Sequence, residues 1–211
     1  MSGTKVVGTS VTRTDALEKV TGAARYVDDV KFGPGLLYAK LLRSPYPHAK
    51  IVKLDTSKAE ALPGVRAVAT GQEFGNYIGL YLLDRTLYAV DKVRYIGEPV
   101  AGVAADTEDI AAEACKLIEV EYEELPAVHD PEYALAPEAP VIHEKLGEYE
   151  YAPFIFPQPG TNISNYFKVR KGDPENAFKE CSCVIEEEFY VPHLQHTPLE
   201  PHVAVAKYDN A

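Results

Sequence analysis

The sequence has little of what marks secreted, membrane-spanning or disulfide-stabilised proteins. It contains three cysteines, Cys115, Cys181 and Cys183, an odd number without CxxC spacing, which argues against a disulfide framework. No apolar run approaches the roughly 20 residues that cross a bilayer, and the N-terminus lacks the apolar core of a signal peptide. These absences lead us to expect a cytoplasmic protein.

Positive charge is also scarce. There are 21 Lys and Arg against 32 Asp and Glu, which gives a formal net charge of −11 at pH 7. Nucleic acid and anionic membrane surfaces attract basic proteins, so neither is an expected partner. Motifs for nucleotides and nucleophiles are missing too: GxGxxG is absent, no Lys-Ser/Thr follows Gly33 and Gly35, and no Ser or Cys sits in a nucleophile elbow.

The 211 residues, 46% of them hydrophobic, suit one large or two small globular domains. Alternating or apolar runs predict strands at 37–42, 51–54, 65–69, 99–105 and 119–124, with one or two more within 71–92. The clearest helix runs from about Thr107 to Leu117, and its apolar residues recur at helical spacing. The alternation of strands and helices predicts an α+β domain over residues 1–128.

Beyond this domain the pattern changes. Residues 126–159 carry seven prolines and little periodicity, so we expect an extended connector over 129–160. A second α+β domain is expected from 161, with strands at 165–170, 184–191 and from Val203, and a short helix starting at Asp173. The strand pattern breaks off in what resembles a hairpin turn, so the chain reads as the front part of a larger protein.

The richest chemistry lies in the segment 193–202, which holds His193, His196, Glu200 and His202 between prolines. The prolines argue against a helix, so the helical zinc spacing does not apply. A metal site, a carboxylate that lines a substrate pocket, and an ordinary surface loop remain open readings. Glu98, within Ile96-Gly97-Glu98-Pro99, is either a catalytic acid or a turn residue before a strand. Two cysteines, at 181 and 183, offer too few ligands for a metal or iron–sulfur site.

Five segments together resemble the large, molybdenum-cofactor-binding subunit of the xanthine dehydrogenase and aldehyde oxidase family. In chain order they are Arg13-x-Asp15-Ala16-x-x-Lys19-Val20-x-Gly22-x-Ala24-x-Tyr26-x-x-Asp29, Arg43-Ser44-Pro45-x-x-His48-Ala49-x-Ile51, Leu62-Pro63-Gly64-Val65-x-Ala67-Val68, Val93-Arg94-Tyr95-Ile96-Gly97-Glu98-Pro99-Val100-Ala101, and Val120-x-Tyr122-Glu123-x-Leu125-Pro126-Ala127-Val128. Over residues 6–128 they resemble the a/b hammerhead domain that opens such subunits. The segment 196–202, His-x-Pro-Leu-Glu-Pro-His, resembles the start of the cofactor-binding domain.

The resemblance implies a molybdenum hydroxylase that oxidises an electron-poor carbon of a heterocycle or aldehyde, with water as the oxygen source. It implies a molybdopterin cofactor, with 2Fe-2S and FAD on partner subunits or domains, and an oligomeric complete enzyme. It also places Glu200 on the substrate side of the active site. Gly97-Glu98-Pro99 matches the hammerhead motif and not the family's catalytic base, which lies far downstream.

The resemblance also sets limits on the chain itself. The glycine-rich loops that hold the pterin and the catalytic base are absent from the 211 residues, so we expect this piece alone to be inactive and to carry no cofactor. Its partners would be the rest of the molybdenum subunit and the iron–sulfur and flavin subunits. An alternative is a non-catalytic interaction or assembly module that keeps the hammerhead fold.

Overall fold

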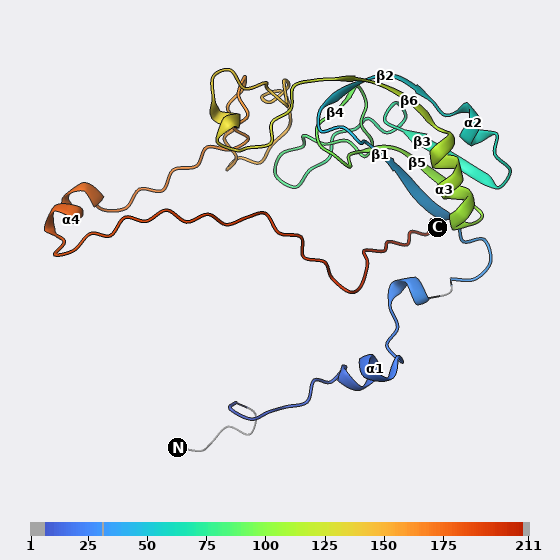
Figure 1. Ribbon diagram of the computed structural model, residues 1–211, viewed down its shortest axis with the longest axis horizontal. Helices are drawn as coiled ribbons and strands as arrows, with labels where there is room; N and C mark the ends of the chain where they lie inside the picture. Colours follow the sequence, from blue (N-terminus) through green and yellow to red (C-terminus); the bar gives the residue numbers. More distant parts are fainter. Residues whose placement is uncertain (1–6, 31, 209–211) are drawn as a thin grey trace. The chain divides into compact units, whose positions relative to one another are not determined.

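The computed structural model describes residues 7–30 and 32–208. Contacts divide the chain into two units, Gly35–Asn176 on the one hand and Met1–Pro34 with Ala177–Ala211 on the other. Each unit is described by itself. Almost all regular structure lies in the first (Figure 1), which we call the sheet unit.

Two small antiparallel sheets form the sheet unit. In the first, β5 (Pro99–Ala105) lies between β1 (Tyr38–Arg43) and β3 (Val65–Thr70). In the second, β2 (Ala49–Asp55) lies between β4 (Lys92–Val93) and β6 (Glu119–Glu124). The central β5 is almost wholly buried, which explains its run of small apolar residues, whereas β6 alternates glutamates with the half-buried Val120 and Tyr122.

Helix α3 (Glu108–Leu117) covers one face of the first sheet (Figure 1). Thr107 has extended backbone geometry, and its hydroxyl accepts a hydrogen bond from the Ile110 amide at 3.2 Å, a side-chain N-cap that ends the preceding strand cleanly. Ala111 and Ala114 are fully buried, and Ala114 joins Ala101, Val103 and Ile118 in the core together with Ala59 of α2 (Ser57–Glu60). The helix predicted from Thr107 to Leu117 is therefore confirmed.

Leu117 gives a first test of this packing. It is half-buried against the core beneath α3, so we expect Leu117→Ala to lower the free energy of unfolding by about 1–3 kcal/mol, below the cost of truncating a fully buried leucine. Urea denaturation of the 211-residue chain measures the change. Lys116→Ala, at an exposed position of the same helix, is the control. A Leu117→Ala variant as stable as the control would show that this position is not core.

Between β3 and β4 the chain forms less regular structure than expected. The strands predicted within 71–92 appear as isolated bridges, Ile78 with Arg85 and Leu82 with Tyr151, and as the two-residue β4. The backbone at Gly79 closely approaches that of Leu82: a Cβ at position 79 would lie 1.9 Å from the Leu82 carbonyl oxygen. Such a close approach is typical of glycine at a bend in place of a regular strand. Between 126 and 160 the one regular element is the short 3-10 helix η2 (Tyr133–Leu135), as expected from the prolines.

The other unit contains α1 (Ala16–Thr21), the 3-10 turn η1 (Val27–Asp29) and most of α4 (Pro174–Glu180). The helix predicted from Asp173 is confirmed, and α1 was not predicted. The strands predicted at 165–170, 184–191 and from Val203 are wrong for the described residues, since these segments pair with no other strand and residues 165–208 are exposed throughout. Alternating sequence favours an extended chain, but a strand also needs a neighbour to receive its hydrogen bonds. No helix within 7–30 and 32–208 is both long and apolar enough to cross a membrane.

Candidate functional site

The loop that carries Glu200 is exposed along its whole length. Glu200 and the three histidines of the segment 193–202 all lie outside any described core, and Leu199 is fully exposed. Thr197 has a φ of 45°, in the left-handed region that β-branched residues rarely adopt, and Pro198 follows it. The prolines at 198 and 201 restrict the backbone of the loop, and Thr197 is in a strained conformation.

This loop forms no metal site in the part of the chain that is described. Neither there nor elsewhere within 7–30 and 32–208 do three or more His, Cys, Asp or Glu side chains come together as ligands. Cys181 and Cys183 are exposed thiols. The reading of the segment 193–202 as a metal centre therefore receives no support from the described geometry.

Glu98, the other candidate acid, has a structural role. Its carboxylate accepts a hydrogen bond from the Arg94 amide, and its backbone carbonyl accepts one from the Ser44 amide at 2.9 Å. Gly97, with a φ of 88°, closes the turn, and its carbonyl accepts a hydrogen bond from the Arg43 guanidinium at 2.8 Å. The Arg43-Ser44 and Gly97-Glu98 segments, far apart in sequence, therefore hold each other in place.

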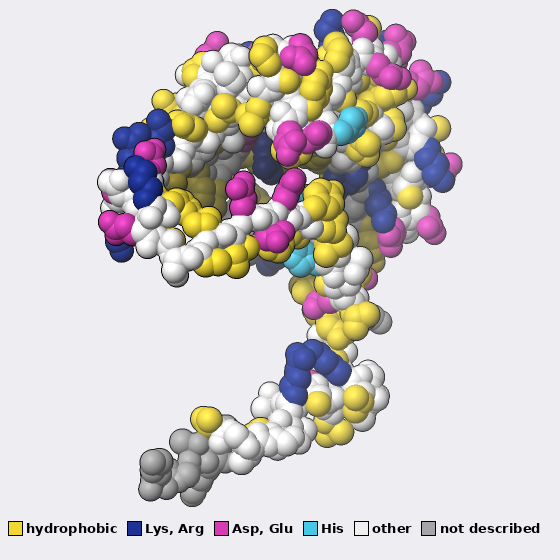
Figure 2. Space-filling view, turned by 60° about the vertical axis from the view of Figure 1, so that its left-hand side comes forward, with side chains coloured by type: hydrophobic (Ala, Val, Ile, Leu, Met, Phe, Trp, Pro, Cys, Tyr) yellow, Lys and Arg dark blue, Asp and Glu magenta, His cyan; other side chains and the backbone are white. Residues whose placement is uncertain are grey.

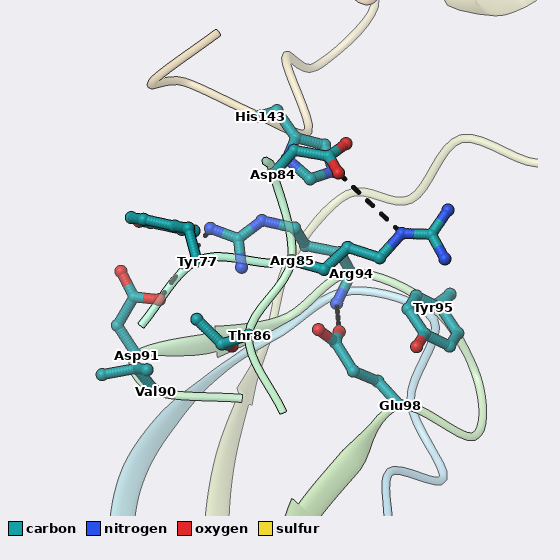
Figure 3. A pocket seen from close by; sticks show the side chains of 10 residues that line it. All are labelled: Tyr77, Asp84, Arg85, Thr86, Val90, Asp91, Arg94, Tyr95, Glu98 and His143. Carbon is teal, nitrogen blue, oxygen red and sulfur yellow. Dashed lines mark hydrogen bonds and ion pairs between the residues drawn. The ribbon is translucent and has the colours of Figure 1, made fainter. Parts of the chain in front are cut away.

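A cavity of about 390 Å³ opens beside this junction (Figure 3). Arg94 crosses it: Nε donates to the Ile142 carbonyl and Nη1 to the Lys92 carbonyl, both at 3.3 Å, and Nη2 lies 3.9 Å from Asp91. The remaining walls come mainly from the segment 77–95 and from His143. A second cavity of about 260 Å³ shares Arg94 and His143 with the first.

Burial shifts the pKa of two groups in the first cavity. It raises the pKa of Glu98 above its usual range, although the amides of Arg94 and Tyr95 and the Arg94 charge act in the opposite direction. It lowers the pKa of His143, and the nearby Arg94 guanidinium lowers it further. The cavity combines a neutral imidazole with paired acids and guanidinium groups, so it has no strong excess of one charge. Acidic, basic and apolar side chains are likewise interspersed over the visible face of the sheet unit (Figure 2).

Reasoning from the sequence alone did not identify the polar residues that the structure buries. Lys92 is 6% exposed and His48 4% exposed, and Asn162 is half-buried with three hydrogen bonds. A signal was present, because Lys92 lies in the short strand directly before Arg94. A charged residue in the mixed run Asp91-Lys92-Val93-Arg94 does not by itself show that it faces inward.

Two family models match the sequence. Residues 21–126 match the model described as aldehyde oxidase and xanthine dehydrogenase, a/b hammerhead domain, and residues 155–211 match the molybdopterin cofactor-binding domain. The first match covers half of the chain and includes both sheets and α3. It confirms the a/b hammerhead fold expected for this region.

Known proteins show the same likeness. A probable xanthine dehydrogenase subunit from Bacillus subtilis is 40% identical over 196 residues, which are 92% of this chain and 24% of that protein. The nicotinate dehydrogenase large molybdopterin subunit of Eubacterium barkeri is 38% identical over 208 residues, 98% of this chain and 45% of that protein. The crystal structure of quinoline 2-oxidoreductase from Pseudomonas putida 86 superposes with a TM-score of 0.56 at 41% identity, over 63% of this chain and 18% of that one. The chain thus spans less than half the length of these proteins.

Proposed function

Because this chain belongs to the aldehyde oxidase and xanthine dehydrogenase family, we propose that it is the N-terminal part of a molybdenum hydroxylase large subunit. The complete enzyme is an oxidoreductase that hydroxylates an electron-poor carbon of a heterocycle or an aldehyde, with water as the source of oxygen. The observation that carries this proposal is the order of the two matches, a hammerhead domain over 21–126 and then a cofactor-binding domain over 155–211. The same order supports the division 1–128, connector 129–160 and truncated second domain 161–211.

The molybdenum cofactor does not fit the described residues alone. They contain no cluster of potential metal ligands, and the segment 193–202 is an exposed loop without walls around it. In the proposal, the molybdopterin is therefore held by parts of the subunit that the relatives have beyond the matched region. No catalytic residue is assigned to this chain, and no step of the reaction is derived from it.

Glu200 is the residue that we place in the substrate pocket. It lies in the stretch that matches the cofactor-binding domain, and prolines on both sides limit the freedom of the loop. A carboxylate held in this way can accept a hydrogen bond from a ring N–H or an enol of the substrate and so orient the ring. A carboxylate in this position can also stabilise positive charge that develops near it on the substrate.

The proposed partners are the rest of the molybdenum subunit and the subunits or domains that carry 2Fe-2S and FAD, in an oligomeric, cytoplasmic enzyme. The names of the relatives, a xanthine dehydrogenase subunit and a large molybdopterin subunit, support a multi-subunit assembly. Nucleic acid and a membrane are not proposed as partners, since the net charge of −11 gives neither an electrostatic advantage.

A second function, from a different class, is a non-catalytic assembly module that keeps the hammerhead fold. The exposed segment 165–208, with large apolar side chains such as Phe189, Tyr190 and Leu199 in water, favours a role in which this chain is completed by another protein surface. The two functions differ in the native mass of the protein in its own cell extract. A polypeptide longer than 211 residues that carries molybdenum supports the enzyme, and a 211-residue chain bound to other proteins supports the module.

Molybdenum content tests the proposal directly. We expect the purified 211-residue chain to contain far less than one molybdenum atom per molecule and to hydroxylate no heterocycle, because it lacks the cofactor loops. Elemental analysis after expression in cells that make the cofactor provides the measurement, and the longer polypeptide from the native extract is the positive control. Stoichiometric molybdenum in the 211-residue chain would contradict the proposal that other parts of the subunit hold the cofactor.

A further inference from the structure

The segment 126–164, which we call the strap, packs firmly although it has almost no regular structure. It contributes no strand to either sheet. Even so, Leu146 is 3% exposed and Tyr149 5% exposed, and the ring of Tyr149 meets the ring of Tyr77 at a centroid distance of 5.0 Å. The strap therefore buries its own side chains against the rest of the sheet unit. Two backbone hydrogen bonds add to these contacts: the Leu83 amide donates to the Glu150 carbonyl at 2.9 Å, and the Ala152 amide donates to the Tyr81 carbonyl at 2.8 Å.

Lys92 of β4 is the centre of these contacts. Its ammonium group forms an ion pair with Glu144 of the strap, and it lies 3.1 Å from Nε2 of His48. The other ring nitrogen of His48, Nδ1, lies 2.7 Å from the carbonyl oxygen of Pro126. A carbonyl oxygen only accepts, so Nδ1 carries the proton and Nε2 accepts from Lys92. The chain of hydrogen bonds thus begins at one point of the strap, Glu144, and ends at another, Pro126.

Because Lys92 is buried, its partners matter for stability. Its side chain is 7% exposed, and a buried ammonium group is costly unless an opposite charge and hydrogen bonds compensate it. Burial acts to raise the pKa of Glu144, but the hydrogen bonds to Lys92 and to its own backbone amide, with the charges of Lys92 and Arg94, outweigh it and lower that pKa. Removing Lys92 or Glu144 would take from the other its partner in the ion pair.

A second set of contacts ties the far end of the strap to its middle. The side-chain amide of Asn162 donates to the carbonyl oxygens of Ala134 at 3.2 Å and Pro140 at 3.0 Å, and its Oδ1 accepts from the Ile142 amide at 2.9 Å. Asn162 belongs to the stretch that matches the cofactor-binding domain. The first residues of that stretch are thus anchored within the sheet unit.

We propose that the strap is a clasp, held closed by Lys92, that fixes the start of the cofactor-binding domain to the hammerhead and opens locally while the two sheets stay folded. The strap can open independently because it is a strand of neither named sheet and meets the segment 81–83 through one isolated bridge, and segments outside a continuous ladder open at lower free energy than the core. Opening also uncovers Arg94, because His143 and Ile142 of the strap line the cavities beside it. This inference does not depend on the molybdenum chemistry.

Hydrogen exchange of the complete 211-residue chain tests the clasp. In Lys92→Met, which keeps the unbranched apolar stem of the side chain and removes its charge, amides of residues 142–152 are expected to exchange about tenfold faster or more, while those of α3 and β5 keep their rates. Lys50→Met is the matched control: Lys50 is the register partner of Lys92 in β2, is half-exposed, and pairs with Glu123 at 3.2 Å. It is expected to change neither region.

Glu144→Gln tests the same ion pair independently, because it changes the residue of the strap and leaves Lys92 and the sheet unchanged. It should accelerate the same amides. Unchanged exchange over 142–152 in both variants overturns the proposal, and so does an equal acceleration in α3 and β5, which would make Lys92 a support of the whole fold. If Lys92→Met does not fold, the Glu144→Gln result decides alone.

Discussion

Replacing Glu200 by glutamine in the complete enzyme is expected to lower turnover by about ten- to a thousandfold, the range for one oriented polar contact at a reacting centre. The molybdenum content should stay unchanged. Glutamine keeps the shape of the side chain but removes the negative charge and one of the two acceptor oxygens. If the carboxylate contacts the substrate more strongly in the transition state than in the ground state, kcat falls more than KM rises.

The expected size of this effect depends on how firmly the loop holds Glu200. Pro198 and Pro201 each fix one backbone torsion, and Thr197 keeps its left-handed φ of 45° between His196 and Pro198. A loop restricted in this way loses little entropy when it presents its side chain to a ligand. In the described residues the side chain of Glu200 is exposed to solvent.

A matched control separates the role of Glu200 from a general loss of negative charge. Glu187→Gln makes the same chemical change at an exposed site in the same part of the chain, outside the segment 193–202. It should leave kcat and KM as in the wild type. Identical kinetics for both variants, with the physiological substrate, would leave Glu200 an ordinary loop residue. Loss of molybdenum in Glu200→Gln would assign it to the cofactor pocket instead.

Gly64→Ala is expected to lower the free energy of unfolding by about 2–4 kcal/mol, the sum of backbone strain and a steric conflict. Gly64 has a φ of +92°, and its missing Cβ would lie 2.8 Å from Cδ1 of Ile110 on α3. Its carbonyl accepts the Asp106 amide at 2.9 Å, just before the helix begins. The turn between α2 and β3 thus touches both the start and the first turns of α3.

Gly97 offers a control that isolates the contact from the strain. It has a similar φ of +88°, but a Cβ there would meet nothing within 4 Å. Gly97→Ala should therefore cost about 1–2 kcal/mol, the backbone term alone. Chemical denaturation of the 211-residue chain compares the two variants. Equal destabilisation would show that the approach of Ile110 to Gly64 is relieved by a small shift of the helix.

The same glycine shows how a family motif acquires its physical meaning. Leu62-Pro63-Gly64-Val65 was recognisable in the sequence by resemblance, and the structure shows that its glycine allows α3 to approach the turn. Arg43-Ser44 and Gly97-Glu98 were likewise separate motifs in the sequence, and hydrogen bonds of 2.8 and 2.9 Å join them. Each motif could be recognised in the sequence alone. The structural role of its residues became clear only from their contacts with a segment that is distant in the chain.

The local elements of this protein could be predicted from its sequence, because they follow from periodicity and capping within a few residues. The apolar spacing of α3 with its Thr107 cap and the apolar run of β5 are examples. The sequence also carried the family resemblance, which the match over 21–126 confirmed.

Which groups are buried and which strands are paired could not be predicted locally, because both depend on residues that are distant in sequence. It buried Lys92 between His48 and Glu144, 44 and 52 residues away. It also left the segment 184–191 unpaired within the described residues, although its sequence favours a strand. A hydrogen bond or ion pair over such a separation leaves no periodic trace in the sequence, because its free energy comes from the folded surroundings and not from its neighbours in the chain.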